Sequence, residues 1–295
     1  MMFKFLVGLL FVSVSVFAFE NEKNIDIDSQ DKEAEKSMQS WLNSEFALKP
    51  YKPNYLLPFG YADKKYKTYS ADEYKNVEAE IQISLKLPVT KNLLGMDEMY
   101  YLAYSHIAFW QIYTNSSPFR ETNYNPEGFI VFPVFDDISD VKLRTIKVSL
   151  AHQSNGQGEE SIKIDKDGNT EIVNRSRSIN YFYADATFQY NNLLMDFIFL
   201  TPSFGESNLS DNPDIMDYWG YTSMKFRYFK QKDIYTLMVR GNPSTGYGAV
   251  EATYSHPLFQ DKTYIFAKFF SGYGESLIDY NNCVTKFSIG VAFSR

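Results

Sequence analysis

Apolar and polar residues alternate along several stretches of the chain with a period of two. Residues 144–150, 181–188 and 287–293 each place apolar side chains at every second position. Alternation over such lengths predicts β-strands with one dry and one wet face. Because no stretch after Ala47 carries a long helical period, the pattern predicts an all-β protein.

Two architectures fit these strands: a soluble β-sandwich, whose apolar faces form a core, and a membrane barrel, whose apolar faces contact lipid. Periodicity alone does not separate them. The roughly 250 residues after Ala47 would supply about 10 to 14 membrane strands of about 9 to 11 residues. Aromatic residues make up 17% of the sequence, as expected for a barrel with aromatic girdles, and the final alternating strand is amphipathic. Both features favour the barrel.

The first residues have the features of a secretory signal peptide. Lys4 is followed by the apolar run 5–17, and a small-residue cleavage site follows at Ala18. This run is too short to span a membrane, so we expect residues 1–18 to be a signal peptide rather than an anchor. Residues 19–46 are acidic and polar and are expected to form a flexible arm. Residues 47–295 would then form the barrel domain.

Charge and composition narrow the classes of function. The formal net charge is -7, which argues against a nucleic-acid partner. Cys283 is the single cysteine and the chain has three histidines, so an intrachain disulfide and a metal site built on His/Cys spacing are both excluded. A calcium site made of oxygen ligands remains open.

Three residues that could form a hydrolytic site share one face of two successive strands. His152 and Ser154 are two residues apart on the strand that carries Leu150, and Asn180 opens the next alternating strand. Their parity places all three side chains on the apolar face. His152 would take the proton from Ser154, and the amide oxygen of Asn180 would orient the imidazole. Spacing alone leaves a surface histidine as the alternative.

Six motifs resemble those of outer-membrane phospholipase A, the integral calcium-dependent phospholipase of Gram-negative outer membranes. They occur in the family's order, and the resemblance covers residues 47–294. The motifs are "SSPFRETNYNPE" (116–127), "HQSNG" (152–156), "SRSIN" (176–180), "DNPDI" (211–215), "NPSTGYGAVE" (242–251) and "SGYGESLIDYN" (271–281).

This resemblance implies a twelve-stranded antiparallel transmembrane β-barrel in the outer membrane, with its active site on the outer surface at the extracellular side. Ser154 would be the nucleophile, His152 the general base and Asn180 the orienting residue, and the backbone N–H of Gly156 would contribute to the oxyanion hole. The reaction would be hydrolysis of phospholipid acyl esters, with phospholipase A1, phospholipase A2 and lysophospholipase outcomes.

The resemblance also implies a homodimer that binds Ca²⁺ at the subunit interface. The ligands would be the Ser176 hydroxyl and the Gln157 carbonyl of one subunit and the Ser116 carbonyl of the other. Asp211 matches an acidic residue tied to a second calcium position, and Glu159 is a further candidate ligand. A cation beside a developing oxyanion would assist a triad whose third member is an uncharged amide.

The loop 157–175 is longer than is usual in the family. Its segment "IDKDGNTEI" is interpreted as a hairpin extension with a turn at Asp167-Gly168. The alternative is a calcium loop with oxygen ligands at alternating positions. His106 falls where the family carries a glutamine that hydrogen-bonds across the dimer; alternatively, it is a histidine whose hydrogen bonds are satisfied within the barrel.

Four other charged residues in the matching motifs are interpreted as structural ion pairs in the lumen or at the rim: Arg120, Glu121, Arg177 and Glu275. Two other functions remain open beside the phospholipase. One is a porin-like barrel in which the catalytic residues have decayed. The other is a barrel esterase that acts on the acyl chains of lipopolysaccharide.

Overall fold

The structure is a computed structural model that describes residues 48–66, 73–135, 140–158, 161–164, 168–203, 209–259 and 262–295. The expected signal peptide (1–18) and acidic arm (19–46) lie outside the described residues, as does Glu159.

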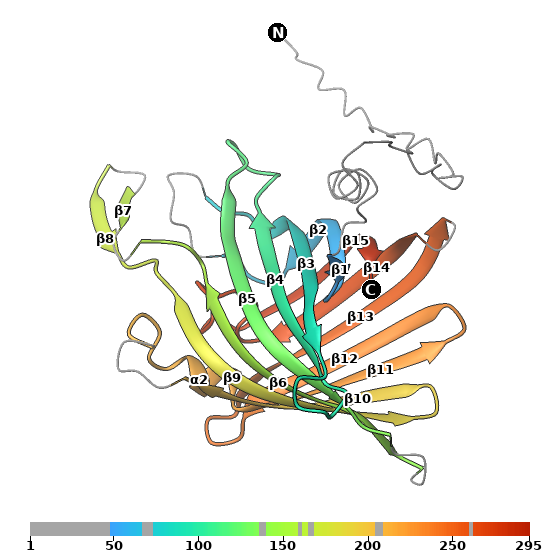
Figure 1. Cartoon of the computed structure of the whole chain (residues 1–295). Coiled ribbons are helices and arrows are strands. Elements are labelled where there is room, and N and C mark those ends of the chain that lie inside the picture. Colours follow the sequence, from blue (N-terminus) through green and yellow to red (C-terminus); the bar gives the residue numbers. More distant parts are fainter. Residues whose placement is uncertain are drawn as a thin grey trace, which may run out of the picture. The chain divides into compact units, whose positions relative to one another are not determined.

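Twelve long antiparallel strands form one closed barrel in the described part of the chain (Figure 1). The last strand, β15, pairs with β2, and this pairing closes the sheet. The two-residue strand β1 (Lys49–Pro50), which precedes β2 in the sequence, pairs with β3. The predicted all-β, twelve-stranded antiparallel barrel is therefore confirmed. The strands are β2 (Asn54–Ala62), β3 (Val77–Lys91), β4 (Met99–Trp110), β5 (Phe119–Pro133), β6 (Lys142–Ser154), β9 (Ser178–Tyr190), β10 (Leu193–Pro202), β11 (Thr222–Lys230), β12 (Asp233–Asn242), β13 (Tyr247–Phe259), β14 (Thr263–Gly272) and β15 (Val284–Ser294).

The connections differ between the two ends of the barrel. One end carries the long segments 155–177, 203–221 and 273–283, and we call it the loop end. The short helix α2 (Ile215–Trp219) lies in the second of these segments. At the opposite end, β9 joins β10 through two residues, and so does β11 to β12. Short turns at one end and long loops at the other are typical of outer-membrane barrels.

The predicted hairpin extension is present in the first long segment. Strand β7 (Ser161–Ile164) pairs antiparallel with β8 (Thr170–Val173), and Gly168 has the left-handed φ of 82° that favours glycine. Asp165 and Asp167 of the alternative calcium loop lie outside the described residues.

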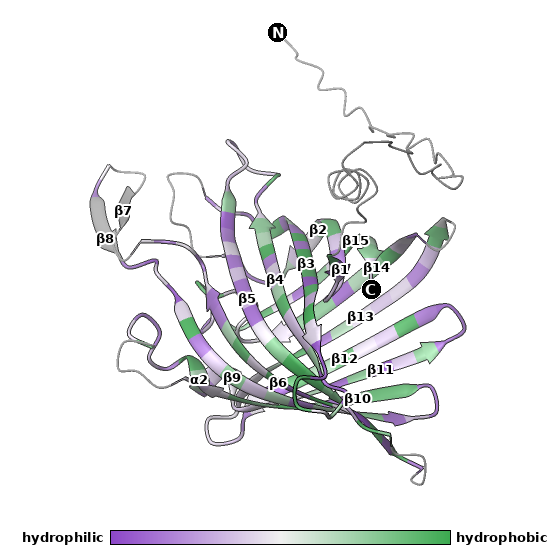
Figure 2. Cartoon of the chain, viewed as in Figure 1, coloured by the Kyte–Doolittle hydropathy of each residue, from purple (hydrophilic) through white to green (hydrophobic). Residues whose placement is uncertain are grey.

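Apolar side chains cover the outside of the barrel wall, and charged side chains fill its interior. Leu150 and Phe182 are 52% and 40% exposed, whereas Glu78, Glu80 and Lys286 are buried. Figure 2 shows the resulting alternation of hydrophobic and hydrophilic residues along the strands. A sandwich would bury its apolar faces, so this inside-out distribution identifies the barrel and excludes the sandwich.

Five charged residues form what we call the interior ion-pair network: Glu78, Arg120, Glu275, Asp279 and Lys286. The guanidinium of Arg120 donates two 2.9 Å bonds to the Glu78 carboxylate and one of 2.5 Å to Asp279. Lys286 Nζ lies 2.9 Å from oxygens of both Glu78 and Glu275. The buried charges are thus compensated by close partners, which burial requires.

The ion-pair interpretation is confirmed for Arg120 and Glu275 and is wrong for Glu121 and Arg177 within the described residues. Glu121 accepts hydrogen bonds from the Asn123 side chain and from the Ile278 amide, so it holds the 273–283 loop. Arg177 donates to backbone carbonyls next to it in the chain.

Among the described residues, no helix has the length and apolar character needed to cross a membrane.

Candidate functional site

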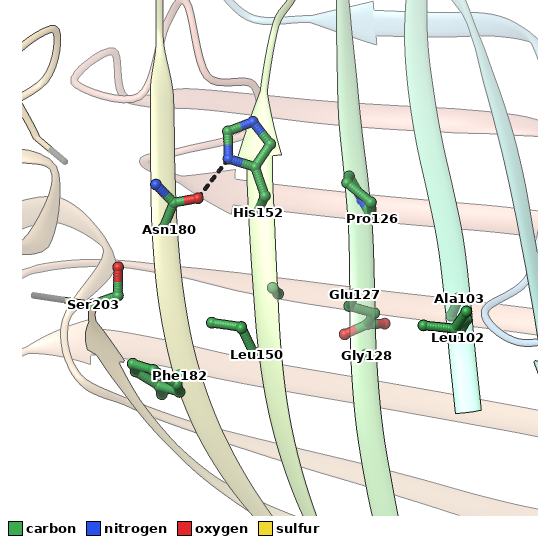
Figure 3. Close-up of a pocket in the computed structure, with 11 residues that line it drawn as sticks. Leu102, Ala103, Pro126, Glu127, Gly128, Leu150, His152, Asn180, Phe182 and Ser203 are labelled. Carbon is green, nitrogen blue, oxygen red and sulfur yellow. Dashed lines mark hydrogen bonds between the residues drawn. The ribbon is translucent and has the colours of Figure 1, made fainter. Parts of the chain in front are cut away.

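A groove of about 700 Å³ lies against the barrel wall beside His152, and we call it the outer groove. Its lining residues come from β4, β5, β6 and β9, together with Ser203 (Figure 3). The groove is mostly apolar, with Leu102, Leu150 and Phe182 along it. Gly128 lies opposite Leu102 and Leu150 in the strand register; a Cβ there would contact Leu102 at 3.7 Å and nothing closer. The missing side chain therefore leaves this space open.

His152 and Asn180 are direct neighbours across β6 and β9. The distance between His152 Nδ1 and Asn180 Oδ1 is 2.8 Å (Figure 3). An amide oxygen only accepts hydrogen bonds, so this contact puts the proton on Nδ1 and leaves Nε2 able to act as a base. The Asn180 backbone is held by the Ser203 amide, which donates to its carbonyl over 2.8 Å. The alternation that places Leu150 outside also places this pair on the outer wall.

Ser154 follows two residues after His152 at the end of β6, opposite Ser178 of β9 and Tyr124 of β5. Its side chain is half-buried and has the outward parity of His152. In the described part of the chain no hydrogen bond joins Ser154 to His152. Side chains two residues apart on an extended strand start about 7 Å apart, and catalytic hydrogen bonds often tighten only with substrate present.

Gly156 is exposed, lies two residues after the end of β6 and has a left-handed φ of 65°. A Cβ at this position would lie 3.0 Å from the ring of Tyr124. Both the backbone angle and the close ring therefore require glycine here. Asn155, between this glycine and Ser154, is buried.

Two of the predicted metal ligands are in contact. The Ser176 hydroxyl donates to Asp211 Oδ2 over 2.6 Å, and the Asn174 side chain donates to the other carboxylate oxygen over 3.2 Å. Gln157 follows Gly156, and its amide donates to the Asn155 side chain over 3.3 Å.

Ser116 lies on a different loop from this group. It is exposed in the turn between β4 and β5, with a φ of 60°. Among the described residues it makes no hydrogen bond with Gln157 or Ser176. Gln157 and Ser176 lie in the segment between β6 and β9, so Ser116 comes from a different loop.

The donors gathered at the loop end suit a hard cation. The hydroxyl of Ser176, the carboxylate of Asp211 and the carbonyl of Gln157 all present oxygen, which Ca²⁺ prefers. In the described ranges no group of three or more His, Cys, Asp or Glu residues could hold a metal ion. The oxygen donors present therefore fit calcium better than zinc.

Side-chain contacts join the loops next to Ser176. The Arg177 guanidinium lies 5.9 Å from the ring centre of Tyr280, and the Tyr280 hydroxyl donates to Asp214. Burial, followed by this hydrogen bond, raises the pKa of Tyr280. Tyr280 thus remains a neutral phenol that joins the 273–283 loop to the segment before α2.

His106 lies half-buried on the outward side of β4. Its ring centre is 5.7 Å from that of Tyr104 and 6.4 Å from that of Tyr124. Its Nδ1 is buried and has no hydrogen-bond partner among the described residues. The alternative of a histidine with its hydrogen bonds satisfied within the barrel is therefore wrong for this atom.

Sequence reasoning missed Asn155 and Asn212, two buried asparagines that bond the backbone around the predicted ligands. Both lie in the quoted motifs "HQSNG" and "DNPDI". An asparagine directly after a strand is a recognisable turn signal. The sequence does not show that Asn155 bonds Arg175, 20 residues further along the chain.

The family model described as Phospholipase A1 matches residues 30–293. Phospholipase A1 of Klebsiella pneumoniae is 32% identical over 255 residues, which cover 84% of this chain and 83% of the relative. A putative phospholipase A1 of Neisseria meningitidis serogroup B is 35% identical over 229 residues, or 75% of this chain. The match spans 56% of that relative's length.

Solved structures agree with these sequence matches. Outer membrane phospholipase A from Escherichia coli superposes with a TM-score of 0.72 at 28% identity, covering 85% of this chain and 93% of that one. The Salmonella typhi outer membrane phospholipase dimer with bound calcium gives 0.72 at 29% identity, covering 85% and 94%. An E. coli variant with an active-site asparagine replaced by alanine gives 0.73 at 28% identity, covering 85% and 93%. The chain therefore belongs to the phospholipase A1 family of Gram-negative outer-membrane β-barrel enzymes.

Proposed function

We propose that the chain hydrolyses phospholipid acyl esters from the outer wall of its barrel, with Ser154 as nucleophile, His152 as general base and Asn180 as the residue that orients the imidazole. The observation that carries the proposal is the 2.8 Å bond between His152 and Asn180 on the lipid-facing wall, at the edge of the outer groove. The E. coli variant, described as an active-site mutant at an asparagine, supports the third role.

The reaction follows from these positions. Ser154 Oγ attacks the ester carbonyl while its proton moves to His152 Nε2, and the Nδ1–H bond to Asn180 keeps the ring oriented. The Gly156 amide donates to the negative oxygen of the tetrahedral intermediate. When the intermediate collapses, the ester C–O bond breaks and the lysophospholipid alcohol takes the proton from Nε2. Water, activated by the same nitrogen, then releases the fatty acid and restores Ser154.

The outer groove supplies the place for an acyl chain. It runs from His152 along Leu150 and Phe182, and these apolar side chains face the bilayer. A fatty acyl chain lying there would bring its ester carbonyl beside the catalytic groups. The gap at Gly128 makes room for the chain against the wall.

We extend the calcium-bound dimer of the Salmonella typhi relative to this chain. Ser176 and Gln157 of one subunit and Ser116 of the other would hold the ion, and Asp211 would serve a second position. When bound, calcium supplies positive charge beside the developing oxyanion. The position of Ser116 on a different loop from Gln157 and Ser176 is compatible with a ligand set completed by a second copy, and the unpartnered His106 Nδ1 on the outer wall supports a contact there.

The proposal is tested on protein refolded into phospholipid bilayers, with calcium and with EDTA. We expect free fatty acid and lysophospholipid with calcium, loss of hydrolysis with EDTA, and recovery when calcium is restored. Absence of hydrolysis in calcium would indicate a decayed barrel, and release of acyl chains only from lipid A would indicate the lipopolysaccharide esterase. Hydrolysis that is indifferent to EDTA would remove calcium from the mechanism.

A further inference from the structure

Asn155 is buried between two accessible residues. It directly follows β6, with the half-buried Ser154 before it and the exposed Gly156 after it, yet only 2% of its own surface is exposed. A small polar side chain that is withdrawn from water at this point must have its hydrogen bonds satisfied by the protein.

The side chain bonds both sides of the long loop. Asn155 Oδ1 accepts from the Gln157 amide at 3.3 Å and from the Arg177 amide at 3.0 Å. Its Nδ2 donates to the Arg175 carbonyl at 2.7 Å, and its backbone amide donates to the Arg177 carbonyl at 3.1 Å. One residue therefore joins the two ends of a segment of more than 20 residues that includes the β7–β8 hairpin.

The residues joined by Asn155 carry the proposed oxyanion and cation groups. Gly156 and Gln157 are on one side, and Ser176, between Arg175 and Arg177, is on the other. On the far side of this segment, the buried Asn212 accepts from the Ser178 amide at 3.0 Å. The backbone on both sides of Ser176 is thus hydrogen-bonded to the Asn155 side chain, and Asn212 bonds the Ser178 amide that follows. The Asn155 side chain also links this backbone to the Gln157 amide next to Gly156.

We propose that Asn155 is a positioning residue that sets the distance between the Gly156–Gln157 backbone and Ser176, and so fixes the geometry at which the oxyanion donor and the calcium ligands act together. This inference rests on the proposed function. Without the Asn155 side chain, the Gln157 and Arg177 amides and the Arg175 carbonyl would lose their partner, and the two sides of the loop would no longer be linked through it.

We call the hydrogen bonds of Asn155 to Gln157, Arg175 and Arg177 the clamp. The clamp also isolates the proposed cation site from the hairpin extension. The β7–β8 hairpin departs and returns between the two clamped ends, so its length does not change the relation between Gln157 and Ser176. A longer loop than is usual in the family is therefore compatible with an unaltered cation site.

The test compares Asn155→Ala with Asn54→Ala. Asn54 is a matched control because it also bonds the backbone, with Nδ2 donating to the Ser84 carbonyl at 3.0 Å and Oδ1 accepting from the Ser84 amide at 2.6 Å. It lies at the start of β2, at the barrel end opposite the loop end. Calcium binding is measured by isothermal titration of the folded proteins, and we expect about 10- to 100-fold weaker binding for Asn155→Ala and no change for Asn54→Ala.

A second readout uses the protein without calcium. Hydrogen exchange at the Gln157 and Arg177 amides should be slow in the native protein and faster in Asn155→Ala, whereas Asn54→Ala should leave both rates unchanged. Equal calcium affinity in the native protein and Asn155→Ala would overturn the inference. If Asn155→Ala does not fold, the native exchange rates decide, because rapid exchange at both amides excludes the clamp. A native protein that binds no calcium and hydrolyses no phospholipid would instead refute the proposed function.

Discussion

The inner and outer sides of the barrel wall use polar groups in opposite ways. In the interior ion-pair network, Arg120 and Lys286 are buried and have carboxylate oxygens within 2.9 Å. On the outer wall, His152 has one nitrogen bonded to Asn180, and Ser154 makes no hydrogen bond with His152 in the described chain. Groups of the first kind hold the wall in one shape, and groups of the second kind remain available to a substrate. Stability and catalysis should therefore respond to different substitutions.

Removing the nucleophile should have the largest effect. Ser154→Ala takes away the proposed nucleophile, so hydrolysis should fall by on the order of 10⁴-fold or more. The denaturant midpoint of unfolding should equal that of the native protein within experimental error, because Ser154 is not part of the interior ion-pair network. The measurement is fatty-acid release from bilayers at saturating calcium.

Ser178→Ala is the matched control, because Ser178 lies directly opposite Ser154 on β9. Its activity should remain within about threefold of the native value, as for a surface substitution that perturbs little. Appreciable hydrolysis by Ser154→Ala would exclude it as the nucleophile.

Breaking the interior network should give the reverse result. Arg120→Met leaves the buried Glu78 and Asp279 without their shared guanidinium, and removal of one buried partner costs about 3 to 5 kcal/mol. The free energy of unfolding, measured by guanidinium titration in bilayers, should fall by that amount, while hydrolysis per folded molecule should change little.

An exposed ion pair provides the contrast for this substitution. Lys65 and Glu73 are 3.7 Å apart with side chains 70% and 56% exposed, and such pairs contribute about 0 to 1 kcal/mol. Lys65→Ala should therefore barely lower the free energy of unfolding. Equal free energies of unfolding for Arg120→Met and Lys65→Ala would show that the interior ion-pair network does not stabilise the barrel wall.

Asn180→Ala should have an intermediate effect on catalysis. Hydrogen bonds to charged groups contribute roughly 1.5 to 3 kcal/mol, so loss of the bond to the imidazolium should lower kcat by about 10- to 100-fold. Activity should persist, because Ser154, His152 and calcium remain. A loss as large as that of Ser154→Ala would give Asn180 a role beyond orientation.

Filling the outer groove should have the smallest effect. Gly128→Leu places a side chain between Leu102 and Leu150, so KM for long-chain phospholipids should rise by about fourfold to fifteenfold, as expected for the loss of one or two buried CH₂ contacts. Hydrolysis of a short-chain ester should not change, because a short chain does not reach the filled space.

Ala252→Leu is the control on the other side of the barrel. Ala252 lies between the exposed Leu237 and Phe269 on the outer wall, away from the groove. The Ala252→Leu variant should leave KM unchanged for both the long-chain phospholipid and the short-chain ester. An equal rise in KM from both variants would show that the groove does not hold the acyl chain.

The parity of side chains was predictable from local sequence, because a strand has a fixed period of two. This period placed His152, Asn180 and Leu150 on one face, and the structure puts them on the outer wall. The choice between barrel and sandwich was open from periodicity, since both have one dry face. The structure decides in favour of the barrel, because charged residues such as Glu78 and Lys286 are buried in its interior. The strand number came from the resemblance, because strand ends are set by long-range pairing.

Contacts between distant residues were not predictable from pattern. Arg120 and Glu275 were expected to form ion pairs, but the sequence could not assign their partners or show that Glu121 bonds a loop instead. The clamp by Asn155 reaches residues 20 and 22 positions away, and its geometry depends on how β6 and β9 pair. The roles of His152, Ser154, Asn180 and the calcium ligands stay predictions until the variants are measured.

The position of the outer groove fixes the kinetics that experiments should record. A site in this groove would be supplied by diffusion in two dimensions, so turnover should depend on the mole fraction of substrate within the membrane and not on its bulk molarity. Diluting the bilayer with a non-hydrolysable lipid at constant total lipid should slow the reaction in proportion. Both products would be released into the same layer and would compete with fresh substrate as they accumulate.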